Sequence, residues 1–173
     1  MDVLCTDKTG TLTEAHIKLV RHVEPMGQES ERVFELAFLN SHFETGLKSP
    51  LDAAILEHGS FNTEVWRKID EVPFDFERRR VSVLIEKNGE RLLIVKGAPE
   101  DILRLSTHLE AADGTVQTMT PTLRADLRDR FEQLGAKGMR ALGIATRKVG
   151  LEHGTASTQA RRCSAPGGSS NRS

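Results

Sequence analysis

Residues 5–13 (CTDKTGTLT) place a carboxylate, an ammonium group, a glycine and four threonines within nine positions. The stretch shows neither the apolar spacing of a helix nor the alternation of a half-buried strand. A carboxylate can act as the covalent acceptor of a phosphoryl group when a metal ion and nearby hydroxyl or N–H groups hold the phosphate oxygens. Val3–Cys5 predicts a short buried strand, with Asp7 just past its end and Lys8 and Thr9 following. The alternative is a polar turn in which Asp7 and the threonines bond to backbone groups.

Two later stretches also carry chemistry. Lys96–Glu100 (KGAPE) places a lysine at a strand end, beside a glycine and before a helix that starts with proline. This arrangement suits contact with phosphate, and an ordinary exposed lysine is the alternative. Pro73–Arg80 (PFDFERRR) joins two phenylalanines to a run of arginines. An aromatic face can stack on a base, worth about 0.5–1.5 kcal/mol beyond burial. Core packing of at least one phenylalanine and a solvated strand edge of arginines are the alternatives.

Hydrophobic patterning predicts the elements that position these residues. Ser49-Pro50, with Asp52 three positions after the serine, is typical of a capped helix start. Asn88-Gly89 and Asp113-Gly114 indicate hairpin turns. Strands are expected at 16–24, 65–74, 81–86, 91–96 and 139–148, and helices at 29–43, 50–57, 99–106 and from 120–121 to near Gly135 or Gly138. The pattern predicts an α+β fold, an antiparallel sheet with helices packed on it.

Chain length, net charge and cysteine content exclude several classes of protein. A chain of 173 residues suits one domain, or one domain and a tail, and its net charge of −1 gives no case for general binding to nucleic acid or membrane surfaces. No apolar run approaches the roughly 18 residues that span a bilayer. Cys5 and Cys163 lie at opposite ends, so no disulfide framework is expected. Residues 150–173 are mostly small and polar, which predicts a disordered tail. Translation into vector sequence is one origin for such a segment.

The opening stretch resembles the phosphorylation signature of P-type ATPases, in which a small residue precedes Asp-Lys-Thr-Gly-Thr, an aliphatic residue and threonine. The resemblance implies that Asp7 is the phosphorylated aspartate in a catalytic loop with Lys8 and Thr9. It also implies that Asp7 and the backbone carbonyl of Thr9 help to hold Mg²⁺ in the intact protein. KGAPE is similar to the nucleotide-pocket motif of the domain that this family inserts after the loop.

The same resemblance assigns an ATP pocket residue by residue. Phe74 would stack on adenine, and either Arg78 or Arg79 would be the basic residue that follows it. Lys96 would line the pocket floor with its stem and turn its ammonium group to the phosphates, beside Gly97.

Two further assignments each have a structural alternative. Asp52 stands where the family places an acid near the adenine amino group; glutamate is common there, and a capping box with Ser49 would explain Asp52 equally. Arg140, in a segment similar to the last strand of the domain, would face the phosphates, and a strand-edge ion pair is its alternative.

The strings FETGLKSPLDAAI and PFDFERRR look most like bacterial magnesium-translocating P-type ATPases. The resemblance implies residues 1–14 as a segment from the edge of the phosphorylation domain, 15–149 as the nucleotide-binding domain and 150–173 as the tail. The parent would be a cation-transporting ATPase of the bacterial inner membrane, with this domain on the cytoplasmic side and its actuator, phosphorylation and transmembrane domains as partners.

The 173 residues contain no Thr-Gly-Glu actuator motif and no Gly-Asp-Gly-x-x-Asn-Asp loop for Mg²⁺. The chain alone is therefore expected to bind ATP without turnover. It is also expected to be soluble and monomeric and, from its net charge, to bind no nucleic acid. A free-standing phosphotransferase or phosphatase that uses Asp7 is the alternative function.

Overall fold

The computed structural model describes residues 2–8, 17–46, 48–111 and 113–150, and of residues 2–8 only the backbone. Thr9, Cys163 and the expected tail from residue 151 onward lie outside the described residues. Within the described part, the fold is an α+β arrangement, as the patterning predicts. One sheet has six strands in the order β2-β1-β8-β5-β4-β3, and every neighbouring pair is antiparallel.

The observed elements follow the predicted ones closely. Asn88 and Gly89 both have positive φ, 52° and 81°, as a two-residue hairpin turn between β4 and β5 requires. The strands are β1 (Asp2–Lys8), β2 (Ile17–Val23), β3 (Arg67–Asp75), β4 (Arg80–Lys87), β5 (Glu90–Gly97), the short pair β6 (His108–Glu110) and β7 (Val116–Thr118), and β8 (Met139–Val149). The helices are α1 (Glu31–Phe43), α2 (Pro50–His58), α3 (Pro99–Leu105) and α4 (Pro121–Ala136).

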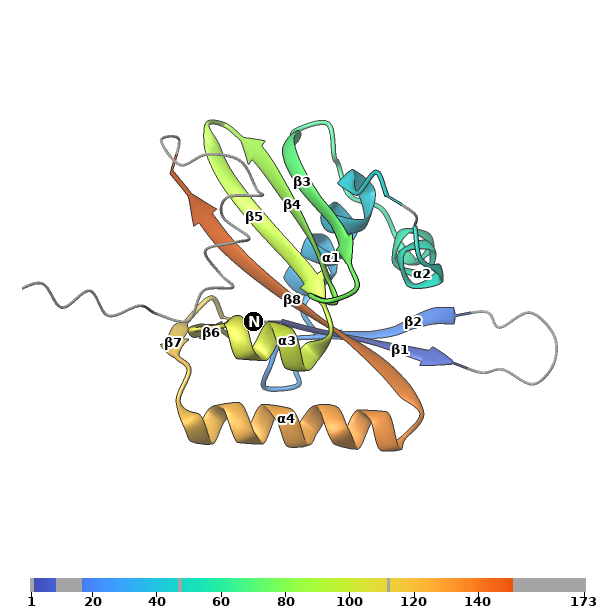
Figure 1. The fold of residues 1–173 in the computed structure, drawn as a ribbon, viewed down its shortest axis with the longest axis vertical. Coiled ribbons are helices and arrows are strands. Elements are labelled where there is room, and N and C mark those ends of the chain that lie inside the picture. The colour runs from blue at the N-terminus through green and yellow to red at the C-terminus, as the bar shows by residue number, and fades with distance from the viewer. Residues whose placement is uncertain (1, 9–16, 47, 112, 151–173) are drawn as a thin grey trace, which may run out of the picture.

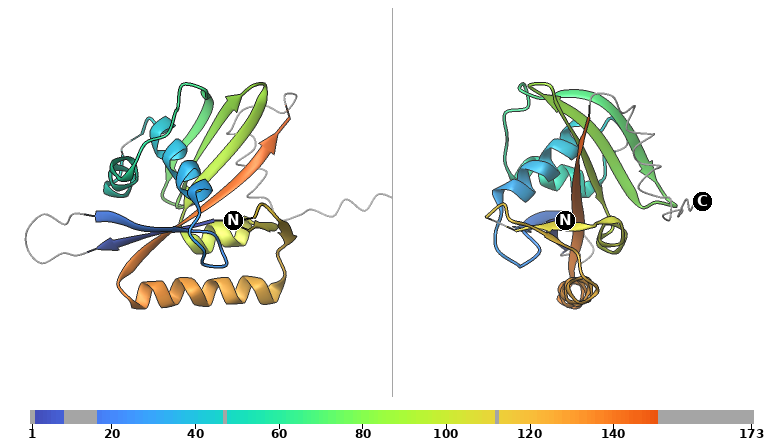
Figure 2. Two further views of the ribbon diagram at one scale, coloured as in Figure 1. Left: turned by 180° about the vertical axis from the view of Figure 1, so that it is seen from behind. Right: turned by 90° about the vertical axis from the view of Figure 1, so that its left-hand side faces the viewer.

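Helices cover both faces of the sheet (Figures 1 and 2). On one face, α1 and α2 pack over a core that contains Phe34, Leu39 and Ile55 together with Ile94 and Ile144 of the sheet. On the other face, α3 and α4 pack over a second core. Its buried helical side chains are Ile102, Leu103, Leu127 and Phe131.

Alternation along β8 supplies side chains to both cores. Leu142 and Ile144 belong to the core under α1, whereas Ala141 and Ala145 belong to the core under α4. This is the expected result of successive side chains pointing to opposite faces of a strand. The middle of the strand, residues 141–145, therefore contacts a core on each face, whereas residues 146–148 are exposed.

The register of β8 opens a gap in the sheet. β8 pairs with β5 from Val149, opposite Arg91, to Gly143, opposite Gly97, where β5 ends. Between Met139 and Leu142, β8 is paired with β1 alone among the described strands. The end of β5 and the start of β8 therefore flank a space that no strand fills.

The first strand is longer than the sequence pattern indicates. Val3–Cys5 is expected as the strand, but β1 continues to Lys8 because Asp7 pairs with Met139 on one side and with Lys18 on the other. Residues 2–8 thus belong to the same six-stranded sheet as β2, β3, β4, β5 and β8. The division of the chain at residue 14 stays a prediction.

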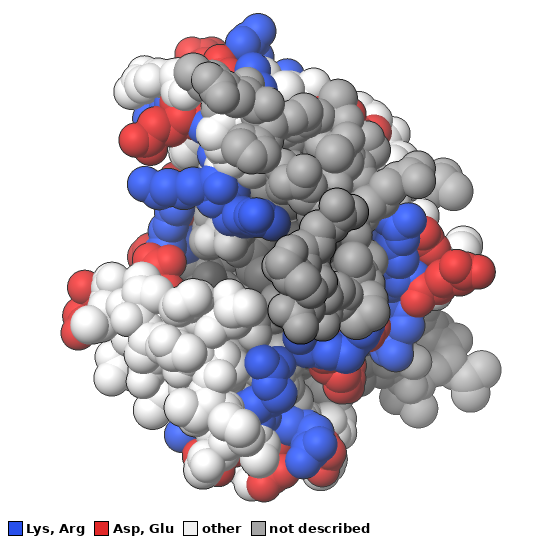
Figure 3. Space-filling view, turned by 60° about the vertical axis from the view of Figure 1, so that its left-hand side comes forward, with Lys and Arg blue, Asp and Glu red and all other residues white. Residues whose placement is uncertain are grey.

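The surface charge is mixed. On the face drawn in Figure 3, basic and acidic side chains lie next to one another in several places, without one large patch of a single sign. Among the described helices, none is long and apolar enough to cross a membrane.

Candidate functional site

A cavity of about 710 Å³ lies at the gap beside β8. Its walls come from the start of α2, the turn between β3 and β4, the end of β5, the start of β8 and the end of α4. Of the residues assigned to nucleotide binding from the sequence, those that line it are Asp52, Phe74, Arg79, Lys96, Gly97 and Arg140. Arg78 does not line this cavity. Residues far apart in the sequence are thus brought to one place.

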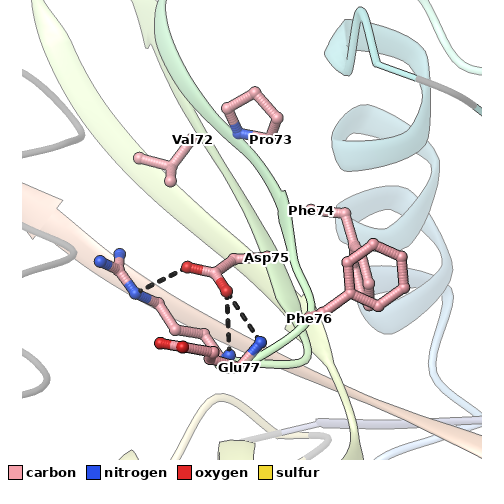
Figure 4. Close-up of a pocket in the computed structure, with 7 residues that line it drawn as sticks. Val72, Pro73, Phe74, Asp75, Phe76 and Glu77 are labelled. Atoms are coloured by element: carbon pink, nitrogen blue, oxygen red, sulfur yellow. Dashed lines mark hydrogen bonds and ion pairs between the residues drawn. The ribbon is translucent and has the colours of Figure 1, made fainter.

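Asp75 fixes the turn that carries the aromatic wall. One carboxylate oxygen accepts hydrogen bonds from the backbone N–H groups of Glu77, at 2.8 Å, and Arg78, at 3.3 Å. The other carboxylate oxygen lies 3.1 Å from Nε of Arg78. Figure 4 shows the carboxylate of Asp75 on the opposite side of the turn from Phe74 and Phe76. The turn therefore holds both rings on the cavity side.

Phe74 and Phe76 form an edge-to-face pair with ring centroids 5.2 Å apart and planes at 86°. Phe74 is 48% exposed and Phe76 is 87% exposed. The expectation that at least one of them packs in the core is wrong. A rigid turn instead presents two large apolar side chains to solvent at the mouth of the cavity, where a flat ligand can stack.

The two candidate arginines are separated by this geometry. Arg78 pairs with Asp75 at 3.1 Å and does not line the cavity. Arg79 has a looser ion pair with Asp101, at 3.9 Å, is mostly exposed and lines the cavity. Arg79 has a φ of 50°, a conformation that costs a non-glycine residue about 1–2 kcal/mol. Its backbone is held by hydrogen bonds from its N–H to the carbonyl of Asp75, at 2.6 Å, and from the N–H of Ala98 to its carbonyl, at 3.1 Å.

Gly97 is required by the close approach of this turn to the end of β5. A Cβ atom at Gly97 would lie 2.6 Å from the carbonyl oxygen of Arg79 and 2.7 Å from Cβ of Arg80. A larger residue would push the arginine-bearing turn away from the cavity. The glycine of KGAPE therefore has a packing role, beyond its proximity to the ligand space.

Lys96 and Asp52 form the cavity floor. Both are buried, with side chains 7% and 5% exposed, and the ammonium group of Lys96 is hydrogen-bonded to Oδ1 of Asp52. Ser41 joins them, since its Oγ lies 2.9 Å from Nζ of Lys96 and 2.8 Å from Oδ1 of Asp52. The ammonium group thus points to the floor, which differs from the expectation that it faces the phosphates.

The capping alternative for Asp52 is confirmed. Oδ2 of Asp52 accepts hydrogen bonds from the N–H of Ser49, at 3.0 Å, and from its Oγ, at 2.6 Å, and the Ser49 hydroxyl caps the N–H of Asp52 in return. Burial raises the pKa of Asp52, but the charge and hydrogen bond of Lys96 and the bonds from Ser49 and Ser41 outweigh it and lower the pKa below its usual value.

Glu44 is a floor residue that the sequence patterning missed. It follows the last residue of α1, its side chain is 2% exposed, and its Oε2 lies 3.5 Å from Nζ of Lys96. Oε2 has no hydrogen-bond partner among the described residues. Burial, and the nearby charges of Asp52 and Glu71, raise the pKa of Glu44, although Lys96 lowers it. Glu44 lies in the string FETGLKSPLDAAI, but nothing in that string indicates that its side chain is buried beside Lys96.

The floor and the mouth of the cavity differ in charge. The floor holds two carboxylates, Glu44 and Asp52, against one ammonium group, Lys96, whereas Arg79 and the exposed Arg140 line the outer part. An apolar, flat group with hydrogen-bond donors suits the floor and the phenylalanine rings. Anionic groups suit the arginines.

The phosphorylation loop is described only in part. Thr6 and Asp7 pair with Arg140 and Met139 in the β1–β8 ladder, so the backbone of Asp7 lies beside a strand that lines the cavity. The roles assigned to Asp7, Lys8 and Thr9 stay predictions, and Thr9 lies outside the described residues. No group of three or more His, Cys, Asp or Glu side chains that could hold a metal ion occurs in the described ranges.

Comparison with known proteins gives a consistent picture. Residues 47–165, more than half of the chain, match the family described as P-type ATPase, cytoplasmic domain N. The chain is 47% identical over 156 residues to a magnesium-transporting ATPase, P-type 1, of Salmonella typhimurium, which covers 86% of the chain and 17% of that relative. It is 40% identical over 160 residues to the Escherichia coli K12 protein of the same name, covering 89% of the chain and 18% of the relative.

A more distant relative has a different ion in its name. A calcium-transporting ATPase 1 of Lactococcus lactis is 27% identical over 169 residues, which covers 85% of the chain and 19% of that relative. The chain thus spans less than a fifth of the length of these three relatives. The matched range contains the cavity residues from Ser49 to Arg140. The chain belongs to the family of P-type ATPase cytoplasmic N domains.

Proposed function

We propose that this chain is the ATP-binding domain of a P-type cation-transporting ATPase and that the transported ion is magnesium. The observation that carries the nucleotide-binding part is the cavity of about 710 Å³, which combines an exposed aromatic pair with a buried polar floor and outer arginines. These are the parts that a purine nucleotide needs: a ring to stack on, a polar group for the base and cations for the phosphates.

The charge distribution supports one orientation of the nucleotide. The floor carries more carboxylates than cations, so phosphate oxygens placed there would meet Glu44 and Asp52 at close range and be repelled. The base therefore lies against Phe74 with its edge toward Lys96. The phosphates extend toward Arg79 and Arg140, where the guanidinium groups can donate hydrogen bonds to them.

The function of the whole pump rests on the relatives. Two of them are named as magnesium-transporting and share 40–47% identity with the chain. We propose that the parent protein lies in the bacterial inner membrane with this domain on the cytoplasmic side, next to actuator, phosphorylation and transmembrane domains. Asp7 would accept the γ-phosphoryl group of ATP and form the aspartyl-phosphate that drives transport. Asp7 and the backbone carbonyl of Thr9 would hold Mg²⁺, which neutralises phosphate charge.

A titration of the chain with ATP, followed by backbone NMR, tests the nucleotide-binding proposal. Resonances of Phe74, Arg79 and Lys96 are expected to move at millimolar ATP, and added Mg²⁺ is expected to change the affinity little. Phe74→Ala is the matched variant, because the ring is 48% exposed and its removal is expected to leave the fold intact. If several millimolar ATP moves no resonance at the cavity of the unmodified chain, the proposal is wrong.

A further inference from the structure

The two carboxylates of the cavity floor differ in how many hydrogen bonds they already make. A carboxylate has about four lone-pair sites. Those of Asp52 are occupied by four donors, namely Nζ of Lys96, Oγ of Ser41, and the N–H and Oγ of Ser49. An incoming donor would have to displace one of them. Asp52 is therefore a poor acceptor for a ligand, although the sequence resemblance assigns it that role.

Glu44, in contrast, accepts few hydrogen bonds from the described residues. Its Oε2 makes no hydrogen bond within the described part of the chain, and its nearest cation, Nζ of Lys96, is at 3.5 Å, beyond the range of a strong charge-assisted bond. Leaving a buried acceptor without a hydrogen bond is costly, and Glu44 lines the cavity, so its carboxylate can accept a hydrogen bond from a group bound there. That group must be a donor.

We infer that Glu44 determines the base specificity of the pocket, by accepting a hydrogen bond from the exocyclic amino group of a 6-aminopurine. This inference rests on the proposed nucleotide-binding function and adds the residue that distinguishes the bases. Rotation of the carboxylate about its terminal bond can bring either oxygen to the base. A 6-oxopurine places a carbonyl oxygen at the same position, which would face the acidic oxygens of Glu44 without a donor between them.

The position of Glu44 is fixed well enough for such discrimination. Its own N–H donates to the carbonyl of Asn40, at 3.0 Å, which ends α1. The next residue, Thr45, is tied to β3 because its N–H donates to Oε2 of Glu71, at 3.0 Å. Glu71 is itself paired with Lys68 at 2.7 Å. The backbone on both sides of Glu44 is thus anchored to the fold.

The test compares ATP with ITP, whose purine carries an oxo group at C6 and a hydrogen on N1 where adenine has an amino group at C6 and an unprotonated N1. Dissociation constants are measured by calorimetry or NMR titration on the unmodified chain and on Glu44→Gln. The unmodified chain is expected to prefer ATP by about tenfold, the scale of a hydrogen bond to a charged group. Glu44→Gln is expected to lose most of this preference, because the amide can either accept from an amino group or donate to an oxo group.

The control variant is Glu100→Gln, which removes another carboxylate that lines the cavity but is exposed. It should keep the ATP preference. A third nucleotide, purine riboside triphosphate with hydrogen at C6, tests the same contact on the unmodified chain even if Glu44→Gln does not fold. It should bind more weakly than ATP.

The outcomes separate the two proposals. If neither ATP nor ITP binds, the nucleotide-binding function itself is wrong. If both bind and the unmodified chain shows no preference, or if Glu44→Gln keeps the full preference, only the role of Glu44 is overturned. Equal binding of ATP and of the nucleotide with hydrogen at C6 would overturn it as well.

Discussion

The ammonium group of Lys96 is hydrogen-bonded to the carboxylate of Asp52, a partner from the first turn of α2, and both side chains are buried. The pair joins the end of β5 to the start of α2, one of the two helices on the α1–α2 face of the sheet. It also removes the cation of KGAPE from the outer part of the cavity. Lys96 is thus a structural part of the floor, and in the proposed function the arginines are the residues expected to contact the phosphates.

Replacing Lys96 with methionine tests this role. Lys96→Met keeps the length of the side chain but leaves Asp52 and Glu44 buried without their cation, which should cost about 3–5 kcal/mol of unfolding free energy. Arg104→Ala is the control, because Arg104 is 70% exposed in its pair with Asp101 and its loss should cost at most about 1 kcal/mol. Denaturant unfolding of both variants gives the comparison.

The same variant also reports on the ligand. Since the ammonium group lies at the floor, Lys96→Met should weaken ATP, ADP and AMP by similar factors, measured where the variant is fully folded. A loss that grows with the number of phosphates would contradict the observed geometry and restore the role expected from the sequence.

Local sequence signals were sufficient for the elements of this fold. Ser49, Pro50 and Asp52 predict the start of α2 because a cap depends only on neighbouring residues, and the capping box is present. Asn88-Gly89 predicts the hairpin for the same reason. The extent of β1 was not predictable, since Asp7 is in the strand only through pairing with distant partners, Lys18 and Met139.

The cavity likewise has residues that sequence motifs predicted and features that depend on tertiary packing. Motifs led to Phe74, Arg79 and Lys96, and these residues do line one cavity. The direction of the Lys96 side chain could not be derived from them, because it depends on where α2 packs. No site role was assigned to Glu44 from the sequence, because its burial and the lack of a hydrogen bond to its Oε2 within the described residues result from tertiary packing around the end of α1.

The pH dependence of stability is a second prediction. Burial, followed by the charges of Asp52 and Glu71, raises the pKa of Glu44 above 4.5 against the opposing effect of Lys96. A raised pKa means that the folded state binds the proton more tightly, so the stabilisation is present below pH 4.5 and is lost as the pH rises through the folded-state pKa. Glu44→Gln cannot ionise. Its unfolding free energy relative to the unmodified chain should therefore increase from acidic to neutral pH.

Glu71→Gln is the control, because the pKa of Glu71 is shifted in the opposite direction from that of Glu44. Burial raises the pKa of Glu71, but hydrogen bonds from Lys68 and Thr45 outweigh this and lower it below 4.5. The stabilisation by Glu71 is present above pH 4.5 and is lost as the pH falls through the folded-state pKa. Denaturant melts across this range should show a deficit for Glu71→Gln at neutral pH that shrinks in acid. Parallel pH profiles for the two variants would refute both assignments.

The exposed aromatic pair allows a clean test of stacking. Phe74→Ala should weaken ATP, ADP and AMP by similar factors, about 1–3 kcal/mol, because all three share the ring. Its melting temperature should change little, since the side chain is 48% exposed; removal of a core phenylalanine would cost about 3–5 kcal/mol. If affinity is unaltered in Phe74→Ala but falls in Phe76→Ala, the stacking residue is Phe76.

The chemistry of Asp7 gives a fourth prediction. Incubation of the chain alone with γ-labelled ATP and Mg²⁺ should give neither hydrolysis nor a hydroxylamine-sensitive phosphoryl label. The reason is that phosphoryl transfer needs metal ions held beside the transferred group, and the family's Gly-Asp-Gly-x-x-Asn-Asp loop is not among the 173 residues. A stable label that disappears in Asp7→Asn would instead support the free-standing phosphotransferase.

The last prediction separates Arg79 from Arg78. Arg79 lines the cavity with an exposed guanidinium group, whereas Arg78 pairs with Asp75, outside the cavity lining. Arg79→Ala should weaken ATP on the order of tenfold, the scale of a charge-assisted hydrogen bond. It should weaken AMP much less, because the contact depends on the outer phosphates. Arg78→Ala should change both affinities equally and little.

Nucleotide titrations of the two variants by calorimetry decide between them, and a thermal melt of each variant shows whether the Asp75 turn has survived. If Arg78→Ala is the variant that weakens ATP selectively while Arg79→Ala does not, the basic residue of the pocket is Arg78. The turn would then have to open on nucleotide binding, which would break the contact of Arg78 with Asp75.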